Sequence, residues 1–186
     1  MSVPNLITLG RLLVVPVEVY LILVGEIGWA FWLFVAAGVS DAVDGFIART
    51  FRSRTHLGGY LDPLADKALL VSVYLALGHA DYLPVWLVIL VVFRDILIVG
   101  GVLLLYTLKE SLAMQPSWSS KVNTTAQIAL AGLVLALHGV DLAALDLDLG
   151  GVVDAMIWVV TATTAVSGAG YLVQGARLLS RQGGTR

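Results

Sequence analysis

Six apolar runs, each long enough to cross the hydrocarbon core of a bilayer, constrain the fold of this chain more than any other feature. They lie at about 5–25, 29–50, 62–80, 83–108, 122–139 and 151–178. A transmembrane helix needs about 20 apolar residues. With 59% hydrophobic and 13% charged residues among 186, the composition lies outside the range of soluble globular proteins. We expect an all-α integral membrane protein, with six transmembrane helices that form a single domain over residues 1–186.

The absence of cysteine limits the chemistry of the chain. It excludes disulfides, thiolate metal sites and a thiol nucleophile, so any metal must be held by oxygen or imidazole ligands. The first residues, 1–4, run into the first apolar segment without the basic region or cleavage site of a signal peptide. We expect a multi-pass protein of a bacterial inner membrane, because no transit peptide is found.

The basic residues at the ends of the spans and between them predict the orientation in the membrane. They fall at alternate connections and at the C-terminal end, and they are Arg49, Arg52, Arg54, Lys109, Lys121, Arg177, Arg181 and Arg186. The other connections contain acids but no lysine or arginine; these acids are Glu26, Asp81, Asp141, Asp146 and Asp148. The positive-inside rule therefore places both termini in the cytoplasm.

Four aspartates cluster at the expected cytoplasmic ends of the second and third spans. Asp41 and Asp44 are three residues apart, and Asp62 and Asp66 are four apart, so each pair projects to one face of its helix. A charged group at bilayer depth is costly and usually marks a site. Oxygen ligands at this density suit Mg²⁺ or Mn²⁺, and a pair of such ions is the clamp used for displacement at phosphorus. We expect two divalent cations in a cavity open to the cytoplasmic side.

Small residues and one arginine accompany the acids. Gly45 has no Cβ, which lets a ligand approach the backbone of the second span, and Ala48 lies on nearly the same face. Arg49 offers a planar donor fork suited to a phosphate, while Gly58 and Gly59 are expected in the short linker where the chain turns. Each residue alone has an ordinary explanation in helix packing or membrane topology. Together they indicate a nucleotide diphosphate held by metals.

Residues 41–66 resemble the signature of the CDP-alcohol phosphotransferase family, Asp-x2-Asp-Gly-x2-Ala-Arg-x8-Gly-x3-Asp-x3-Asp, at every defined position. Members of that family are six-helix homodimeric membrane enzymes. They transfer a substituted phosphate from a CDP-alcohol, often CDP-diacylglycerol, to the hydroxyl of a second alcohol and release CMP. The resemblance therefore implies a homodimer in the lipid bilayer with CDP-diacylglycerol as donor, and no nucleic-acid partner.

The resemblance also implies roles for the motif residues. Two divalent ions on the diphosphate would be held by Asp41, Asp44, Asp62 and Asp66. The CDP moiety would be received by Asp41, Gly45, Ala48, Arg49, Gly58 and Asp62. Asp66 would also be the general base. On physical grounds the carboxylate least committed to metal is best suited to that role, and the sequence alone does not rank the four.

Two further segments bear on the acceptor alcohol. Residues 120–124, Ser-Lys-Val-Asn-Thr, and the pair Arg94-Asp95 resemble the corresponding segments of eukaryotic-type cardiolipin synthases. Phosphatidylglycerophosphate synthases more often have a second lysine at the position of Asn123. A phosphodiester monoanion needs fewer cationic partners than a phosphomonoester dianion, so phosphatidylglycerol is the expected acceptor and cardiolipin the product. The alternative acceptor is glycerol 3-phosphate. For Arg94 and Asp95 the alternative is an ion pair that packs helices together.

The start of the chain contributes further candidates. Residues 4–11 resemble the entry to the first helix of phospholipid-synthesising members and place three polar residues at three-residue steps on one face. The candidates for binding the acceptor or a phosphate are thus Asn5, Thr8, Arg11, Arg94, Lys121 and Asn123. For the first three, an N-cap and topology anchors are the alternative. Glu18, in the middle of the first span, has no partner that the sequence identifies.

A cation transporter is the alternative from another functional class. Its acids would be distributed through the depth of the membrane, whereas the four aspartates cluster on one side. The motif also occurs once, and nothing in the last three spans mirrors it, which counts against an inverted-repeat transporter.

Overall fold

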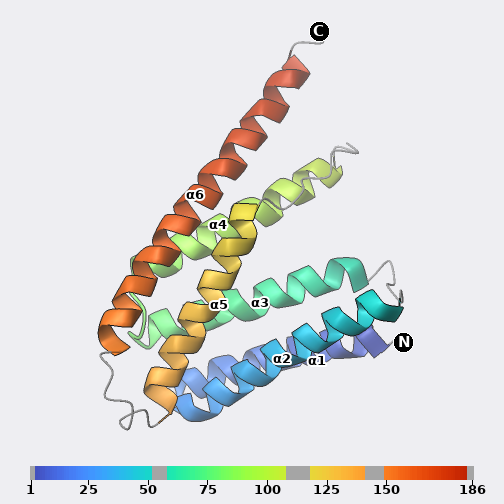
Figure 1. Ribbon diagram of the computed structural model, residues 1–186. Helices are drawn as coiled ribbons and strands as arrows, with labels where there is room; N and C mark the ends of the chain where they lie inside the picture. Colours follow the sequence, from blue (N-terminus) through green and yellow to red (C-terminus); the bar gives the residue numbers. More distant parts are fainter. Residues whose placement is uncertain (1–2, 52–57, 108–117, 141–148, 184–186) are drawn as a thin grey trace. The chain divides into compact units, whose positions relative to one another are not determined.

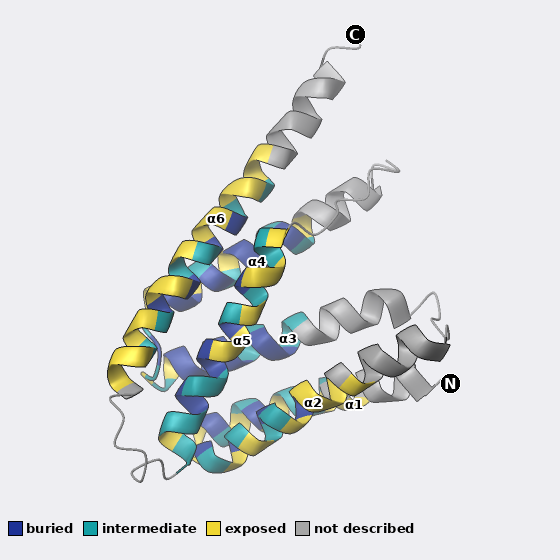
Figure 2. Ribbon diagram, viewed as in Figure 1, coloured by how far each residue is buried: buried dark blue, intermediate teal, exposed yellow. Residues whose placement is uncertain are grey.

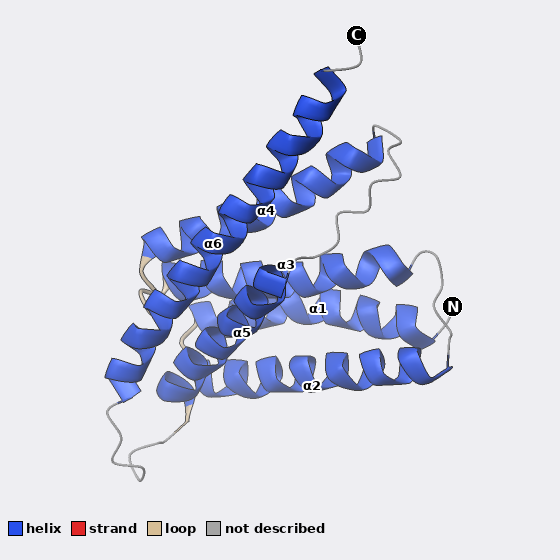
Figure 3. Ribbon diagram, turned by 45° about the horizontal axis from the view of Figure 1, so that its top comes forward, coloured by secondary structure: helices blue, strands red, loops and turns tan. Residues whose placement is uncertain are grey.

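A computed structural model shows six helices and no strand in the described residues, which are 3–51, 58–107, 118–140 and 149–183 (Figures 1 and 3). The helices are α1 (Val3–Leu23), α2 (Ile27–Phe51), α3 (Gly58–His79), α4 (Val85–Thr107), α5 (Trp118–Gly139) and α6 (Leu149–Gly183). Each coincides with one of the six apolar runs, which confirms the all-α prediction.

Two helical stretches, Trp118–Gly139 and Gly150–Val173, are long and apolar enough to cross a membrane among the residues that the structure describes. Figure 2 shows exposed residues along much of the described part of α6. They include large apolar side chains such as Trp158, which is 67% exposed, and Val166, which is 64% exposed. Such a surface suits contact with lipid. The crossing of the membrane by all six helices and their orientation stay predictions.

Two helices begin earlier than the apolar runs suggest. The prediction that Gly58 and Gly59 lie in a linker is wrong, because α3 begins at Gly58. Helix α5 begins at Trp118, so Lys121 lies inside its first turns. Hydropathy marks where apolar residues begin, whereas the backbone hydrogen bonds of a helix continue through the polar turn that precedes them.

A glycine in the left-handed conformation ends α1. Gly25 has a φ of 83°, which a residue without a Cβ adopts readily. Its N–H donates to the Ile22 carbonyl at 3.2 Å, and the N–H of Glu26 donates to the Leu21 carbonyl at 2.9 Å. These are the two bonds of a Schellman cap. The cap allows α2 to begin directly afterwards, at Ile27.

The helices group into two compact units. The first comprises residues 1–85 and 131–150, and the second comprises residues 86–130 and 151–186, so that α5 contributes to both. In the first unit, α1 packs against α2 and α3 (Figure 1). The second unit holds α4, the first part of α5 and α6. The single domain over residues 1–186 stays a prediction.

In the first unit, the start of α2 meets the end of α5 backbone to backbone. A Cβ added at Gly139 would lie 2.6 Å from the carbonyl oxygen of Ile27 and 2.8 Å from the nitrogen of Gly28. A Cβ at Gly28 would lie 2.8 Å from the carbonyl oxygen of Gly139. All three distances are too short for a side chain. Small residues allow membrane helices to approach this closely, so the contact requires glycine at both positions.

Gly139→Ala should therefore destabilise the protein, because the two backbones must separate to admit the methyl group. We expect a loss of about 1–3 kcal/mol, measured as a lower melting temperature of the purified protein in detergent. Gly38→Ala in α2 is the matched control, since no atom of the described residues lies within 4 Å of its added Cβ. Equal melting temperatures for the two variants would contradict the close contact.

Candidate functional site

The predicted metal and CDP residues lie in two helices. Helix α2 contains Asp41, Asp44, Gly45, Ala48 and Arg49, and α3 contains Gly58, Asp62 and Asp66. Because each pair of aspartates belongs to one continuous helix, its spacing places both members on one face. Asp41 is the one of these eight residues whose side chain is described, and it is exposed. The other side chains, and those of Asn5, Thr8 and Arg11, lie outside the described residues, so their roles stay predictions.

The donor set suits a hard divalent cation, because all four predicted ligands are carboxylates. No group of three or more possible metal-ligating side chains occurs among the described residues, and three of the four aspartates fall outside that set. Lys67 follows Asp66 directly in α3 and is partly buried. The sequence interpretation counted Arg49 as the one cation near the four aspartates. It missed Lys67.

In the second unit, Arg94 of α4 joins three helices. Its Nη1 donates to Oδ1 of Asp95 at 2.7 Å. Its Nη2 donates to the hydroxyls of Ser120 in α5 and Ser167 in α6, each at 2.7 Å, and its Nε donates to Ser167 at 3.2 Å. Arg94 is 2% exposed and Asp95 is 3% exposed. All three guanidinium nitrogens thus have protein partners.

This geometry shows the ion pair between Arg94 and Asp95 that the alternative interpretation proposed. A buried guanidinium is costly unless it is paired with an opposite charge and hydrogen-bonded. Asp95 provides the opposite charge, and Ser120 and Ser167 accept the remaining hydrogen bonds. The contacts favour a role in holding α4, α5 and α6 together, and acceptor binding by Arg94 stays a prediction.

Asn123 makes a second polar link between α5 and α6. Its Oδ1 accepts hydrogen bonds from the hydroxyls of Thr163 and Thr164, each at 2.8 Å. The residue has no exposed surface, and its Nδ2 has no hydrogen-bond partner among the described residues. Lys121, two residues earlier, is exposed. Two residues of segment 120–124 are candidates for binding the acceptor alcohol, and they differ. Asn123 is a buried amide, whereas Lys121 is an accessible cation.

Sequence reasoning missed the α6 partners in this network. A contact between α5 and α6 was indicated by the three-residue spacing of Ser120 and Asn123 in α5. Thr164 and Ser167 in α6 have the same spacing. Polar residues at this spacing in an apolar helix form a stripe on one face, and such stripes mark contacts between membrane helices. The partner of each stripe is found only in the structure.

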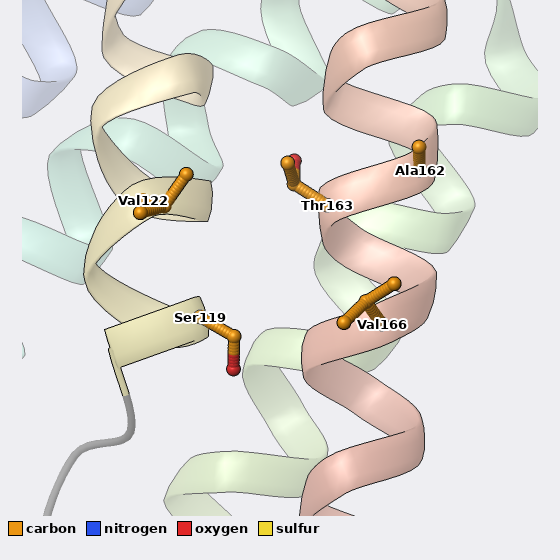
Figure 4. Close-up of a pocket in the computed structure, with 5 residues that line it drawn as sticks. All are labelled: Ser119, Val122, Ala162, Thr163 and Val166. Atoms are coloured by element: carbon orange, nitrogen blue, oxygen red, sulfur yellow. The ribbon is translucent and has the colours of Figure 1, made fainter.

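A pocket of about 270 Å³ lies between α5 and α6. Figure 4 shows the residues that line it, Ser119 and Val122 on α5, and Ala162, Thr163 and Val166 on α6. The surface that lines it is almost wholly apolar. One lining residue, Thr163, bonds through its hydroxyl to Asn123, so the pocket lies next to the buried amide's partner.

Glu18 of α1 is fully buried in the first unit. Neither of its carboxylate oxygens has a hydrogen-bond partner among the described residues. No partner for Glu18 could be identified from the sequence, and no contact in the described part of the first unit assigns it a role.

The comparisons with known proteins point to a lipid-synthesising family. The sequence model of the family described as CDP-alcohol phosphatidyltransferase matches residues 1–167. A cardiolipin synthase (CMP-forming) of Rattus norvegicus is 35% identical over 151 residues, 73% of this chain and 50% of the relative. A CDP-diacylglycerol--glycerol-3-phosphate 3-phosphatidyltransferase of Oryza sativa, named as chloroplastic, is 34% identical over 197 residues, 98% of this chain and 59% of the relative.

A bacterial relative is similar as well. A putative cardiolipin synthase of Mycobacterium tuberculosis is 36% identical over 108 residues, 58% of this chain and 52% of the relative. The chain spans about half the length of the curated relatives that it matches.

Removing the counter-ion of Arg94 should destabilise the second unit. Asp95→Ala leaves the guanidinium buried without an opposite charge, at a cost of about 3–5 kcal/mol. Ser167→Ala removes two hydrogen bonds but keeps the charge pair, so it should cost about 1–3 kcal/mol. The melting temperature in detergent measures both. Asp154→Ala, which changes an exposed carboxylate of α6, is the control. If Asp95→Ala melts at the temperature of that control, the ion pair does not hold the helices.

Proposed function

The chain belongs to the CDP-alcohol phosphatidyltransferase family, and from that premise we propose that this transferase moves a phosphatidyl group from CDP-diacylglycerol to phosphatidylglycerol. The products are cardiolipin and CMP. The observation that carries the proposal is the similarity to cardiolipin synthases (CMP-forming) over 151 residues. The segment 120–124 supports the same acceptor.

In the proposed reaction, the acceptor hydroxyl oxygen bonds to the phosphorus that bears diacylglycerol. The bond from that phosphorus to the bridging oxygen of the diphosphate breaks, and CMP leaves. Asp66 takes the hydroxyl proton as general base. The CDP moiety is bound by Gly45, Ala48, Arg49 and Gly58 together with Asp41 and Asp62.

The four motif aspartates, Asp41, Asp44, Asp62 and Asp66, would hold two divalent cations, Mg²⁺ or Mn²⁺. When bound, such ions neutralise the negative charge of a diphosphate. The placement of each aspartate pair within one continuous helix supports this proposal. Without metal, four carboxylates and the anionic substrate would repel one another.

Glycerol 3-phosphate is the second candidate acceptor. It is supported by the relative from rice, whose name specifies that acceptor and which matches 98% of this chain. Phosphatidylglycerol is favoured because a neutral amide, Asn123, stands where a second lysine is more common in enzymes that bind the phosphomonoester. A doubly charged phosphate gains more from a cation than a singly charged phosphodiester does.

We also propose that the protein is embedded in a lipid bilayer as a homodimer, with all six helices crossing the membrane and both termini in the cytoplasm. The apolar runs and the charge bias support the crossing, and the dimer rests on the family resemblance. The expectation of a bacterial inner membrane gains no support from the relatives, because they come from an animal and a plant as well as a mycobacterium.

The acceptor can be tested with purified protein, CDP-diacylglycerol and Mg²⁺ or Mn²⁺. Phosphatidylglycerol and glycerol 3-phosphate are offered separately, and CMP and lipid products are measured. We expect cardiolipin and one CMP per turnover with phosphatidylglycerol, and little product with glycerol 3-phosphate. Phosphatidylglycerophosphate as the sole lipid product would refute the proposed acceptor.

Metal removal tests the role of the aspartates. Excess chelator should abolish CMP release, and added Mg²⁺ or Mn²⁺ should restore it. Asp41→Asn keeps the shape of the side chain but removes its charge, so we expect a rate lower by about two orders of magnitude or more. Asp154→Asn, at an exposed carboxylate of α6, should keep the normal rate. Full turnover in chelator would rule out the two-metal site.

A further inference from the structure

The pocket between α5 and α6 opens to the outside of the second unit. Its walls belong to the two helices whose described stretches, Trp118–Gly139 and Gly150–Val173, are long and apolar enough to cross a membrane. Two of the lining side chains are largely exposed, Val122 at 46% and Val166 at 64%. Figure 4 shows one of them on each helix. In a bilayer the pocket is therefore reached from the lipid.

Two polar links hold the walls of the pocket at a fixed separation. The hydroxyl of Thr163, a lining residue, donates to Oδ1 of Asn123 at 2.8 Å. Arg94 of α4 donates to Ser120 of α5 and Ser167 of α6, each at 2.7 Å. Closing the pocket would break buried hydrogen bonds, which is costly. The space between the helices is thus built into the second unit.

The size and polarity of the pocket restrict what can fill it. Its volume is about 270 Å³, and the surface that lines it is almost wholly apolar. A helix with its side chains is about 10 Å across, which is too wide to enter. A slender apolar chain can enter, and in a membrane it gains van der Waals contacts with the walls. An acyl chain has this shape and this chemistry.

The charge beside the pocket selects the headgroup. Lys121 is exposed and directly precedes Val122, a lining residue. Trp118, on the same turn of α5, is 81% exposed, and tryptophan is enriched where membrane meets water. A lysine at that level attracts anionic headgroups. The other exposed charge described in the second unit, Asp154, lies eight residues before Ala162, about 12 Å along α6. The cation therefore decides the charge preference.

We propose that the pocket between α5 and α6 holds one acyl chain of an anionic phospholipid, whose phosphate group pairs with Lys121. This lipid is retained as part of the protein and is not a reactant, so its site is a further one beside that of the proposed function. All the residues that form it belong to the second unit.

Filling the pocket tests the site for the acyl chain. Purified full-length protein in detergent is titrated with phosphatidylmethanol, which has a single negative charge and no headgroup hydroxyl, and native mass spectrometry counts the bound molecules. We expect wild type to bind one molecule that Ala162→Phe binds about tenfold more weakly, and Ala162→Leu should weaken binding less. Ala165→Phe is the matched control, an exposed position of α6 outside the lining residues, and should bind as wild type does.

Removing the cation tests the headgroup. Wild type should bind phosphatidylmethanol about fivefold more tightly than phosphatidylcholine, whose net charge is zero. Lys121→Gln should lose this preference. Asp154→Asn, which changes the distant exposed carboxylate, should keep it.

Three results would overturn the lipid site. They are equal lipid binding by Ala162→Phe and Ala165→Phe, equal affinity of wild type for the two lipids, and a lower dimer fraction in Ala162→Phe with lipid binding unchanged, which would mean that a second copy covers the pocket. Melting temperatures in detergent check that the variants fold. Because phosphatidylmethanol cannot act as an acceptor, these results do not depend on which acceptor the enzyme uses.

Discussion

A guanidinium buried among apolar helices must have a counter-ion and a partner for each nitrogen, and the second unit depends on how Arg94 meets that requirement. Its charge is balanced by Asp95 within α4, and its remaining bonds reach Ser120 of α5 and Ser167 of α6. Because a buried guanidinium with an unpaired nitrogen would be costly, these bonds favour one arrangement of the three helices. In the same arrangement the Oδ1 of Asn123 accepts hydrogen bonds from Thr163 and Thr164 of α6.

The helices could be predicted from the sequence because six apolar runs, each about as long as a membrane-spanning helix, are separated by short polar connections. Their ends could not, as Gly58 shows, since a helix continues into polar residues wherever its backbone bonds can form. The Arg94–Asp95 pair was foreseen as an alternative because the two residues are adjacent. Ser167 was not foreseen as a partner, because sequence spacing describes one helix and does not tell which other helix faces it.

The aspartate motif of residues 41–66 predicts its chemistry more directly than segment 120–124 predicts the acceptor alcohol. Four carboxylates at helical spacing in an apolar sequence have few uses other than holding cations, so the proposed metal site rests on residue type and spacing. Of these four side chains, that of Asp41 is the one that the structure describes. The two candidate acceptors differ in the charge of one phosphate group, which residue type and spacing indicate less directly. Cardiolipin synthases and a glycerol-3-phosphate transferase are both similar to this chain, so the relatives support both candidate acceptors.

The central claim is that one phosphatidyl group from CDP-diacylglycerol joins one intact phosphatidylglycerol. It is tested most directly by supplying the two lipids with different acyl chains to the purified protein and determining the product by mass spectrometry. The account predicts cardiolipin with two acyl chains from each lipid, and one CMP released per molecule formed. Cardiolipin whose four acyl chains all come from phosphatidylglycerol, formed without CMP, would contradict it.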